Sequence, residues 1–349
     1  MSPGIPSFAV VSGRSVQRAL HGREPAVIDL IESAYRLHGA GSTVNPPSYF
    51  LRFPDQPNSR IIALPASVAG NVDTAGLKWI ASFPDNVANG LPRASAVLLL
   101  NDRRTGYPYA CLESSVISAS RTAASAALAA LRLGAGRAER GRVGFIGTGL
   151  ISRYIHTYLD AAGWPFTRIG VHDLAAGRTR GFTEYLRGRT DIPVKAFGSA
   201  EELIRESDVV VFATTAGKPH VSDPGWFSHH PLVLHISLRD VSEEIVLDSV
   251  NVVDDVEHCL KANTSVHLTE QRVGHRDFVH ATLHDVLTGG YEVPADRTVL
   301  FSPFGLGVLD LALGAFVYRE CLRAGELVAI DGFFSELETH GSTEPATVG

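Results

Sequence analysis

The spacing of hydrophobic and polar positions changes partway along the chain. Residues 25–40 carry apolar side chains three and four positions apart, which predicts an amphipathic helix with Pro25 in its first turn and Gly39 near its end. Residues 46–112 show short β-rich segments separated by Pro, Gly, Asn and Asp, which predicts a mostly antiparallel sheet. The Ala-rich segment 117–133 predicts another helix.

From residue 142 onward, short apolar segments alternate with helical ones. This alternation is typical of a doubly wound parallel sheet, so an α/β fold is expected here. A long apolar helix is predicted at 305–322, and we expect it to pack back on the first part of the chain. The strands are expected at 142–147, 168–173, 194–197, 208–215, 231–237, 250–255 and 298–303, with helices at 150–163 and 200–207.

Composition excludes several classes of protein. Hydrophobic residues make up 45% of the 349 residues, which suffices for a packed globular core. The net charge of −6 and the lack of a long basic run argue against a nucleic-acid partner. No apolar stretch is long enough to span a membrane, and the N-terminus lacks a signal-peptide pattern. The scattered Cys111, Cys259 and Cys321 predict reduced thiols in a cytoplasmic protein.

A glycine-rich turn lies between the predicted strand 142–147 and the helix that follows it. Its residues are Gly147, Thr148, Gly149, Leu150, Ile151 and Ser152. Apart from serine at the last small position, they match the G-x-G-x-x-G/A pattern that binds dinucleotides. The first glycine makes the tight turn, and the second lets the backbone approach a pyrophosphate at the helix N-terminus. The alternative is a glycine turn that binds nothing.

Other residues extend the predicted cofactor site. Asp173 ends the next strand, where a carboxylate would bond the ribose hydroxyls and repel a 2′-phosphate, so NAD is favoured over NADP. Alternatively, Asp173 is only a strand-end residue. Thr214 and Thr215 end a strand at the carboxyl edge of the sheet and are predicted to line the cofactor groove, unless they are ordinary strand residues. Thr122 and Ser237 complete the predicted cofactor-binding set.

Three isolated cations point to an acidic substrate. Arg52, Lys78 and Arg121 are single cations in weakly charged segments, and they predict binding of the carboxylates of an amino-acid-derived molecule. Alternatively, each is a side chain without a binding role, whose aliphatic part is buried and whose charged end reaches solvent. Asp240 lies beyond the end of a predicted strand and is a candidate acid–base residue. It fits equally well as a helix N-cap, with Glu243 completing a capping box. Lys78 would share in proton transfer if burial lowers its pKa.

No metal site or nucleophile is predicted. The spacing of His280 and His284 would place both imidazoles on one helix face, but HExxH and a third ligand in register are missing, so a solvated helix is favoured. Cys111 lies in a β-rich stretch, which favours a core position over a nucleophile.

These features occur together in one known family. GLKW around Lys78, the RTAA sequence 121–124, the glycine turn at 147–149 and the strand end at Asp240 follow one another as in the ornithine cyclodeaminase/mu-crystallin family. The chain resembles that family over about residues 5–335. The resemblance implies that Arg52, Lys78 and Arg121 contact substrate carboxylates and that Asp240 is the catalytic acid–base residue.

The resemblance also implies a domain plan. A discontinuous α+β domain for substrate binding and dimerisation is expected at 1–133 plus 305–340, with an NAD-binding Rossmann domain inserted at 134–304. The protein would be a homodimer, and the tail 341–349 is expected to be disordered.

One branch of the family is similar in more detail. NPPSYFLRFP, GLKWIASFPDN, LESSVISASRTAASAALA and GFIGTGLISRYI look like segments of the dehydrogenases of 2,3-diaminopropionate biosynthesis of the staphyloferrin B pathway type. This implies NAD-dependent oxidative hydrolysis of N-(1-amino-1-carboxy-2-ethyl)-L-glutamate to L-2,3-diaminopropionate and 2-oxoglutarate, for siderophore or antibiotic biosynthesis.

Three alternatives stay open within the family. They are an ornithine cyclodeaminase, another amino-acid or imine dehydrogenase, and a non-enzymatic protein that binds NAD or another ligand. SLRDVSEEIV around Asp240 departs from the Gly-rich acidic segment usual in the cyclodeaminases, which speaks against ornithine cyclisation. The retained Lys78, Arg121 and Asp240 speak against a protein without catalytic activity.

Overall fold

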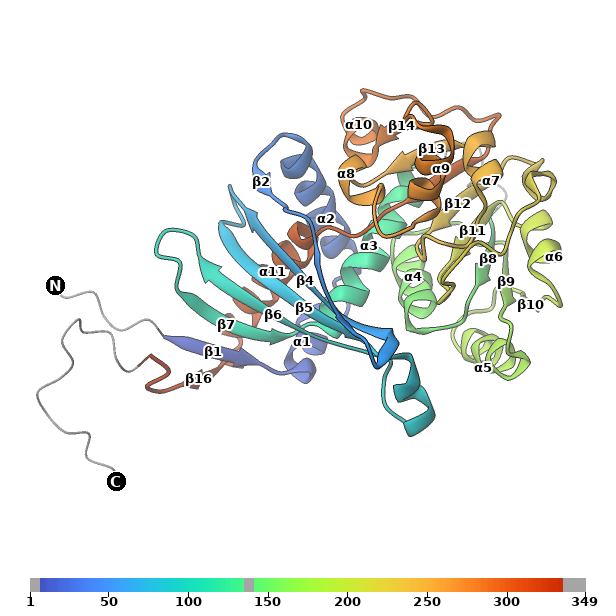
Figure 1. Cartoon of the computed structure of the whole chain (residues 1–349). Coiled ribbons are helices and arrows are strands. Elements are labelled where there is room, and N and C mark those ends of the chain that lie inside the picture. Colours follow the sequence, from blue (N-terminus) through green and yellow to red (C-terminus); the bar gives the residue numbers. More distant parts are fainter. Residues whose placement is uncertain (1–6, 135–140, 335–349) are drawn as a thin grey trace, which may run out of the picture. The chain divides into compact units, whose positions relative to one another are not determined.

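The computed structural model describes residues 7–134 and 141–334, and it divides the chain into two compact units. Each unit is described by itself, and Figure 1 shows the elements of both. Unit 1 comprises Met1–His21, Thr43–Ile117 and Asp310–Gly349, whereas unit 2 comprises Gly22–Ser42 and Ser118–Leu309.

Unit 1 is built on a sheet whose described strands follow the order β16-β1-β7-β6-β5-β4-β2, with β3 also paired to β4. All pairs are antiparallel except β1 with β7, which confirms the mostly antiparallel sheet. The strands are β1 Phe8–Val11, β2 Thr43–Val44, β3 Tyr49–Phe53, β4 Gln56–Val68, β5 Thr74–Ser82, β6 Ala94–Asp102, β7 Pro108–Glu113 and β16 Val328–Ile330. The helices are α1 Gly13–Leu20, the 3-10 helix η1 Pro84–Asn89, and α11 Gly307–Arg323, which enters the unit at Asp310.

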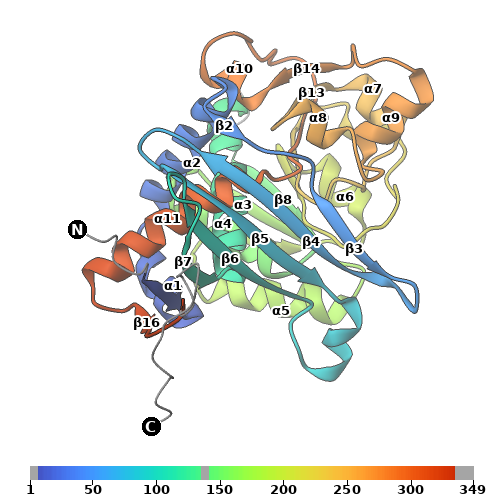
Figure 2. The ribbon, with the colours of Figure 1, turned by 60° about the vertical axis from the view of Figure 1, so that its left-hand side comes forward.

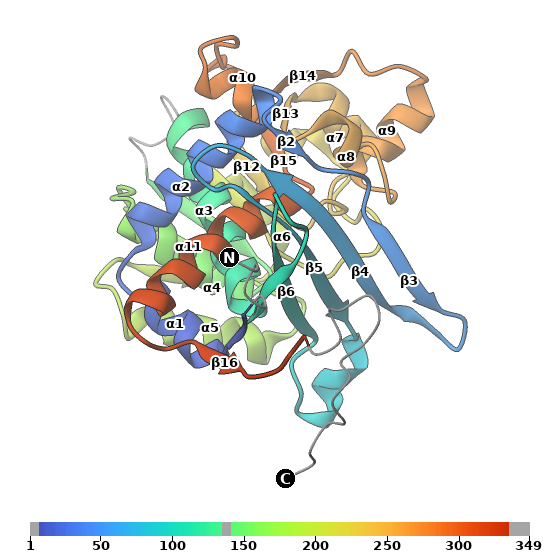
Figure 3. The ribbon, with the colours of Figure 1, turned by 90° about the vertical axis from the view of Figure 1, so that its left-hand side faces the viewer.

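One face of this sheet packs against α11. A Cβ on Gly76 of β5 would lie 2.8 Å from the Leu311 side chain, and a Cβ on Gly314 would lie 2.2 Å from that of Leu98. Glycine at these two positions therefore lets helix and sheet approach closely. Figures 2 and 3 show β4, β5 and β6 side by side, with α11 beside them. The predicted long helix is confirmed, as is its packing on the first part of the chain.

Unit 2 contains a parallel sheet whose described strands follow the order β10-β9-β8-β11-β12-β15-β13-β14. The chain runs outward from β8 in both directions, so the β8–β11 boundary is the topological switch point where ligands bind in such folds. The strands are β8 Arg142–Ile146, β9 Arg168–His172, β10 Val194–Ala196, β11 Val209–Phe212, β12 Leu232–His235, β13 Val250–Val253, β14 Val279–Thr282 and β15 Val299–Ser302. This confirms the doubly wound sheet.

The helices of unit 2 include two that come from the first part of the chain. They are α2 Glu24–Gly39, α3 Ser115–Leu133, α4 Leu150–Ala161, α5 Ala176–Arg187, α6 Ala200–Arg205, η3 Pro224–Phe227, α7 Glu243–Asp248, α8 Val256–Cys259, α9 Ser265–Val273 and α10 Leu283–Leu287. Helix α3 begins in unit 1 and continues into unit 2. The hydroxyl groups of Tyr35 and Ser125 lie 2.8 Å apart and join α2 to α3.

The compact units differ from the predicted domain boundaries. Residues 22–42 and 118–133 were expected in the first domain but cluster with unit 2. The reason is packing: α2 contacts α3, α4 and α10, and Arg132 donates to Glu32 at 2.9 Å. The chain returns from unit 2 to unit 1 at residue 310, whereas the predicted boundary was at residue 305. The predicted disorder of 341–349 lies outside the described residues.

The histidine pair expected on one helix was wrongly placed. His280 lies on strand β14, whereas His284 lies on the short helix α10. The strand was missed because four residues are too few to show a period. His284 is packed against Gly39 of α2, where a Cβ would lie 2.0 Å from the imidazole.

Candidate functional site

The turn between β8 and α4 has two glycines with different constraints. Gly147 has φ +89°, and a Cβ there would lie 2.5 Å from the backbone oxygen of Ala213, so the fold itself requires glycine. Gly149 is the N-cap of α4, and nothing lies within 4 Å of where its Cβ would be. The side chain of Ser152 is buried and donates to the Gly147 carbonyl at 2.6 Å.

The open space over Gly149 is what a bound pyrophosphate needs. No side chain caps the first turn of α4, which begins at Leu150 and Ile151, so its leading N–H groups remain available to a phosphate. Asp173 follows β9 and accepts hydrogen bonds from the backbone N–H of Thr148 at 3.1 Å and from its hydroxyl at 2.9 Å. These residues fit a dinucleotide whose ribose lies beside a carboxylate.

Asp240 lies beyond β12 at the same sheet edge, and its side chain is fully buried. Its carboxylate accepts hydrogen bonds from the hydroxyls of Thr214 and Ser237, each at 2.5 Å. The structure therefore brings together three residues predicted separately, although Thr214 and Ser237 were assigned to the cofactor. The helix N-cap interpretation of Asp240 is wrong, because Ser242 caps α7.

Two histidines complete the surroundings of Asp240, and sequence reasoning missed both. Nε2 of His220 lies 3.2 Å from Oδ1, and Nε2 of His235 lies 3.2 Å from Oδ2. His235 is fully buried, whereas the side chain of His220 is 40% exposed. His220 is also fixed by its backbone N–H, which donates to the Asp240 carbonyl at 2.9 Å. We refer to His220, Asp240, Thr214 and Ser237 as the carboxylate cluster.

Hydrogen bonds keep the Asp240 carboxylate ionised. Burial alone would raise its pKa, but the hydrogen bonds from His220 and Ser237 and the adjacent His235 imidazole hold the pKa well below its usual range. The carboxylate is therefore a weak base at neutral pH. It can instead orient a neighbouring imidazole through a hydrogen bond, and His220 is the imidazole partner that reaches solvent.

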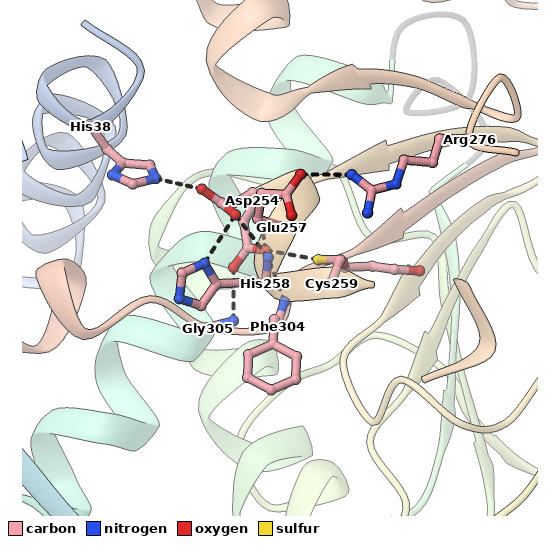
Figure 4. Close-up of polar contacts among 10 residues, drawn as sticks. His38, Asp254, Glu257, His258, Cys259, Arg276, Phe304 and Gly305 are labelled. Carbon is pink, nitrogen blue, oxygen red and sulfur yellow. Dashed lines mark hydrogen bonds and ion pairs between the residues drawn. The ribbon is translucent and has the colours of Figure 1, made fainter. Parts of the chain in front are cut away.

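Arg121 lies on α3, next to Thr122, and above a turn that precedes α11. Gly305 has φ +93°, and a Cβ there would lie 2.6 Å from Nη1 of Arg121. The buried Asp254 holds this turn by accepting from the backbone N–H groups of Phe304 at 2.9 Å and Gly305 at 2.7 Å (Figure 4). The guanidinium of Arg121 lies so close to residue 305 that only glycine fits at this position.

The residue after Asp254 fixes α2 to the same region. The carboxylate of Asp255 lies 3.0 Å from Nε2 of His38 on α2 and 2.9 Å from Nδ1 of His258 on α8. These contacts hold the pKa of Asp255 below its usual range despite its burial. Together, Asp254 and Asp255 connect the end of β13 to α2, to α8 and to the turn before α11.

The two cations of unit 1 lie on one face of its sheet. Lys78 is 2% exposed and its Nζ donates to Oδ2 of the fully buried Asp310 at 2.6 Å. The interpretation of Lys78 as a side chain that reaches solvent is therefore wrong, and the negative charge beside it comes from α11. Arg52 on β3 is exposed, with its guanidinium 5.2 Å from the centre of the Phe50 ring.

The remaining predicted features are quickly placed. Within the described residues, no group of three or more His, Cys, Asp or Glu side chains is arranged to hold a metal ion. No described helix is long and apolar enough to cross a membrane. The three cysteines are not disulfide-bonded, and burial raises the pKa of the Cys111 thiol.

Comparison with known proteins places the chain. The model of the ornithine cyclodeaminase/mu-crystallin family matches residues 11–325. The chain belongs to this family. The family explains why a Rossmann-like parallel sheet and a separate, mostly antiparallel sheet occur together in one chain.

Individual family members are similar over most of their length. The N-((2S)-2-amino-2-carboxyethyl)-L-glutamate dehydrogenase of Staphylococcus aureus is 28% identical, covering 87% of this chain and 93% of that protein. An archaeal alanine dehydrogenase dimer with bound NAD is 25% identical, with a TM-score of 0.82 over 94% of this chain and all of that one. The Δ1-pyrroline-2-carboxylate reductase of Thermococcus litoralis has a TM-score of 0.84 at 24% identity, covering 93% of this chain and all of that one, and it shows the shared fold.

Proposed function

We propose that the protein is an NAD-dependent oxidoreductase that cleaves a secondary amine, N-(1-amino-1-carboxy-2-ethyl)-L-glutamate, to L-2,3-diaminopropionate and 2-oxoglutarate. The Staphylococcus aureus relative, whose name describes the same class of substrate, supports this choice. The observation that carries it is the position of the carboxylate cluster: β8, β11 and β12 are neighbours, so Asp240 and the glycine turn follow strands at one edge of one sheet.

The distance between these features suits a dinucleotide. Strands in a sheet lie about 4.8 Å apart, so the ends of β8 and β12 are separated by about 10 Å. A cofactor with its pyrophosphate over Gly149 spans such a distance to place its reactive ring near Asp240. When bound, NAD supplies the acceptor for the hydride that leaves the glutamate α-carbon.

We assign the proton to His220, with Asp240 as the group that orients it. With Nε2 donating to Asp240, Nδ1 of His220 carries the lone pair, and no partner for it is recorded among the described residues. His220 then accepts the amine proton as the C=N bond forms, returns it to the imine nitrogen, and, neutral again, accepts a proton from the water that attacks the iminium carbon. The ionised Asp240 stabilises the imidazolium in both steps. Collapse of the resulting carbinolamine breaks the C–N bond, and the departing amine takes up a proton.

The cations hold the substrate in this scheme. Arg121 and Arg52 bind carboxylates through paired hydrogen bonds, and Lys78 adds a fixed positive charge. Holding the reacting carbon in one orientation lowers the activation barrier. For well-aligned reacting groups this effect is about 7–11 kcal/mol.

The experiment is incubation of the purified protein with NAD and a panel of ornithine, alanine and N-(1-amino-1-carboxy-2-ethyl)-L-glutamate. The proposal predicts lasting NADH formation only with the third compound, with 2-oxoglutarate and 2,3-diaminopropionate identified by mass. Conversion of ornithine to proline without net NADH would instead establish the cyclodeaminase alternative. NADH formation from alanine would establish an alanine dehydrogenase.

A further inference from the structure

Arg93 lies just before β6 and has no acidic partner within residues 7–134 and 141–334. Its Nη1 donates to the hydroxyl of Ser82 at 2.7 Å, and the side chain is half-buried. Among the described residues, no carboxylate pairs with it. Burial lowers the pKa of its guanidinium with no opposing attraction from an anion. A desolvated cation normally has a paired carboxylate, so this arrangement costs folding free energy.

The position of Arg93 on the sheet places it among other cations. Arg52, Arg60, Ser82 and Ala94 lie directly opposite one another across β3, β4, β5 and β6. Residues opposite one another share a face of the sheet, so the guanidinium at Ser82 lies on the same face as Arg52 and Arg60. Neighbouring strands are about 4.8 Å apart, which puts the Cα atoms of Arg52 and Ser82 about 10 Å from each other.

This face also carries Lys78, four residues before Ser82 on β5. The rise of about 3.4 Å per residue separates the two Cα atoms by about 13 Å. Contacts of α11 with β5 include Gly76 and Lys78, in the first half and at the middle of the strand. The end at Ser82 is therefore a second centre of positive charge, distinct from the Lys78–Asp310 pair.

We propose that Arg93, together with Arg52, binds a second carboxylate of the substrate, and so selects compounds with at least two carboxylates over those with one. Guanidinium groups on the same face of a sheet repel each other, an anion between them relieves this repulsion, and their planar forks match a carboxylate. The inference rests on the proposed function for the substrate class, an amino-acid derivative with carboxylates several atoms apart. Sequence reasoning counted Arg52, Lys78 and Arg121 and overlooked Arg93, because PRAS before a strand carries no motif.

The test uses two ligands that differ by one carboxylate, 2-oxoglutarate and pyruvate, titrated into the NADH-loaded protein by calorimetry. Arg93→Gln is expected to weaken 2-oxoglutarate about 30-fold, as for loss of a charge-assisted hydrogen bond pair, and to change pyruvate less than about twofold. Arg93→Lys keeps the charge and loses the fork, so it should recover part of the affinity. If Arg93→Gln does not fold, Arg93→Lys and Ser82→Ala carry the test, each with a severalfold loss for 2-oxoglutarate alone.

The control is Arg103→Gln, which removes an equal charge from unit 1 at an exposed ion pair with Asp73. It should change neither affinity. Equal losses for both ligands in Arg93→Gln, or no loss for 2-oxoglutarate, would overturn the inference. The test measures binding and not turnover. It can therefore show that Arg93 determines selectivity even if the protein does not oxidise the amine substrate. The two proposals therefore fail separately.

Discussion

At the scale of single residues, the buried Asp240 is the feature on which the chemistry depends. Its carboxylate receives hydrogen bonds from two hydroxyls and contacts two imidazoles, which is more than a structural N-cap would require. An ionised group held in this way does not exchange protons near neutral pH. We therefore propose His220 as the group that transfers the proton, although no motif in the sequence singles it out.

Replacement of these two residues should have different effects on pH dependence. Asp240→Asn is expected to lower kcat at least about 100-fold at every pH, because the imidazolium loses its counter-charge. His220→Gln should also lower kcat, and should remove the fall in kcat/KM on the acidic side. Rates measured from pH 5 to 9 check both, with NAD affinity as the control. A His220→Gln profile that keeps its acidic fall would contradict the assignment.

Acid unfolding gives an independent check on Asp240. Since its pKa is lower in the folded state than in the unfolded chain, Asp240 stabilises the fold above about pH 4, and this contribution disappears as the pH falls toward the folded pKa. Asp240→Asn should therefore flatten the loss of stability between about pH 4 and 2. An unchanged acid-unfolding curve would mean that the carboxylate is not held as described.

The Lys78–Asp310 pair poses a different question, since both members are buried. Lys78→Met removes the cation beside the buried Asp310 carboxylate and should cost about 3–5 kcal/mol of unfolding free energy, whereas the double variant with Asp310→Leu should recover most of it. Denaturant unfolding and turnover are measured for both variants. If Lys78 binds substrate, the double variant is stable and inactive. Recovered activity would show that Lys78 serves only the fold.

At the scale of elements, the two glycines of the β8–α4 turn are expected to have different roles, Gly147 in folding and Gly149 in NAD binding. Gly147→Ala should destabilise unit 2 by at least about 2 kcal/mol, because it forces a positive φ and a contact with Ala213. Gly149→Ala meets open space, so the melting temperature should stay within about 2 °C while NAD binds at least 10-fold more weakly. Calorimetric titration with NAD measures this. Unchanged NAD affinity in Gly149→Ala would contradict the prediction that the pyrophosphate binds at this turn.

The sequence was sufficient for elements with a clear period and insufficient for short or packed ones. The strand and helix around the glycine turn were predicted because apolar runs, glycine and the 3.6-residue spacing agree there. Strand β14 is four residues long, and its pairing with β13 is a long-range contact. The grouping of α2 with unit 2 likewise depends on tertiary packing, which no local pattern reports.

The candidate site divides in the same way. Gly147, Asp173 and Asp240 could be predicted because Gly147 and Asp173 end predicted strands and Asp240 closely follows one, at the sheet edge where ligands bind. His220 and Arg93 were not, because each lies in a connection outside a regular element and gains its meaning from one contact, with Asp240 and Ser82 respectively. Asp310 was missed because a single acid in a long apolar helix has no partner until the sheet is placed against it.

At the scale of the whole molecule, an exposed apolar row on the sheet of unit 1 favours a homodimer. Tyr49, Ala63, Trp79 and Val97 lie directly opposite one another across β3 to β6. Tyr49 is 68% exposed, and Trp79 and Val97 are about 40% exposed. An apolar row of this kind is typical of a surface that another protein covers. We expect a second copy of this chain to cover the row.

Trp79→Glu tests this surface, because it places a charge at the centre of the row. Light scattering coupled to size exclusion should show a dimer for the natural chain and a monomer for the variant. Leu322→Glu, at an exposed site on α11, is the control and should stay dimeric. A dimer in both variants would place the interface elsewhere.

The central claim is net transfer of a hydride from the glutamate α-carbon to NAD, followed by hydrolysis. A single-turnover reaction with N-(1-amino-1-carboxy-2-ethyl)-L-glutamate deuterated at that carbon tests it most directly, with NADH and products analysed by mass. We predict one deuterated NADH for each 2-oxoglutarate formed, with no deuterium in 2,3-diaminopropionate. Deuterium retained in an organic product, or product formed without lasting NADH, would contradict the claim.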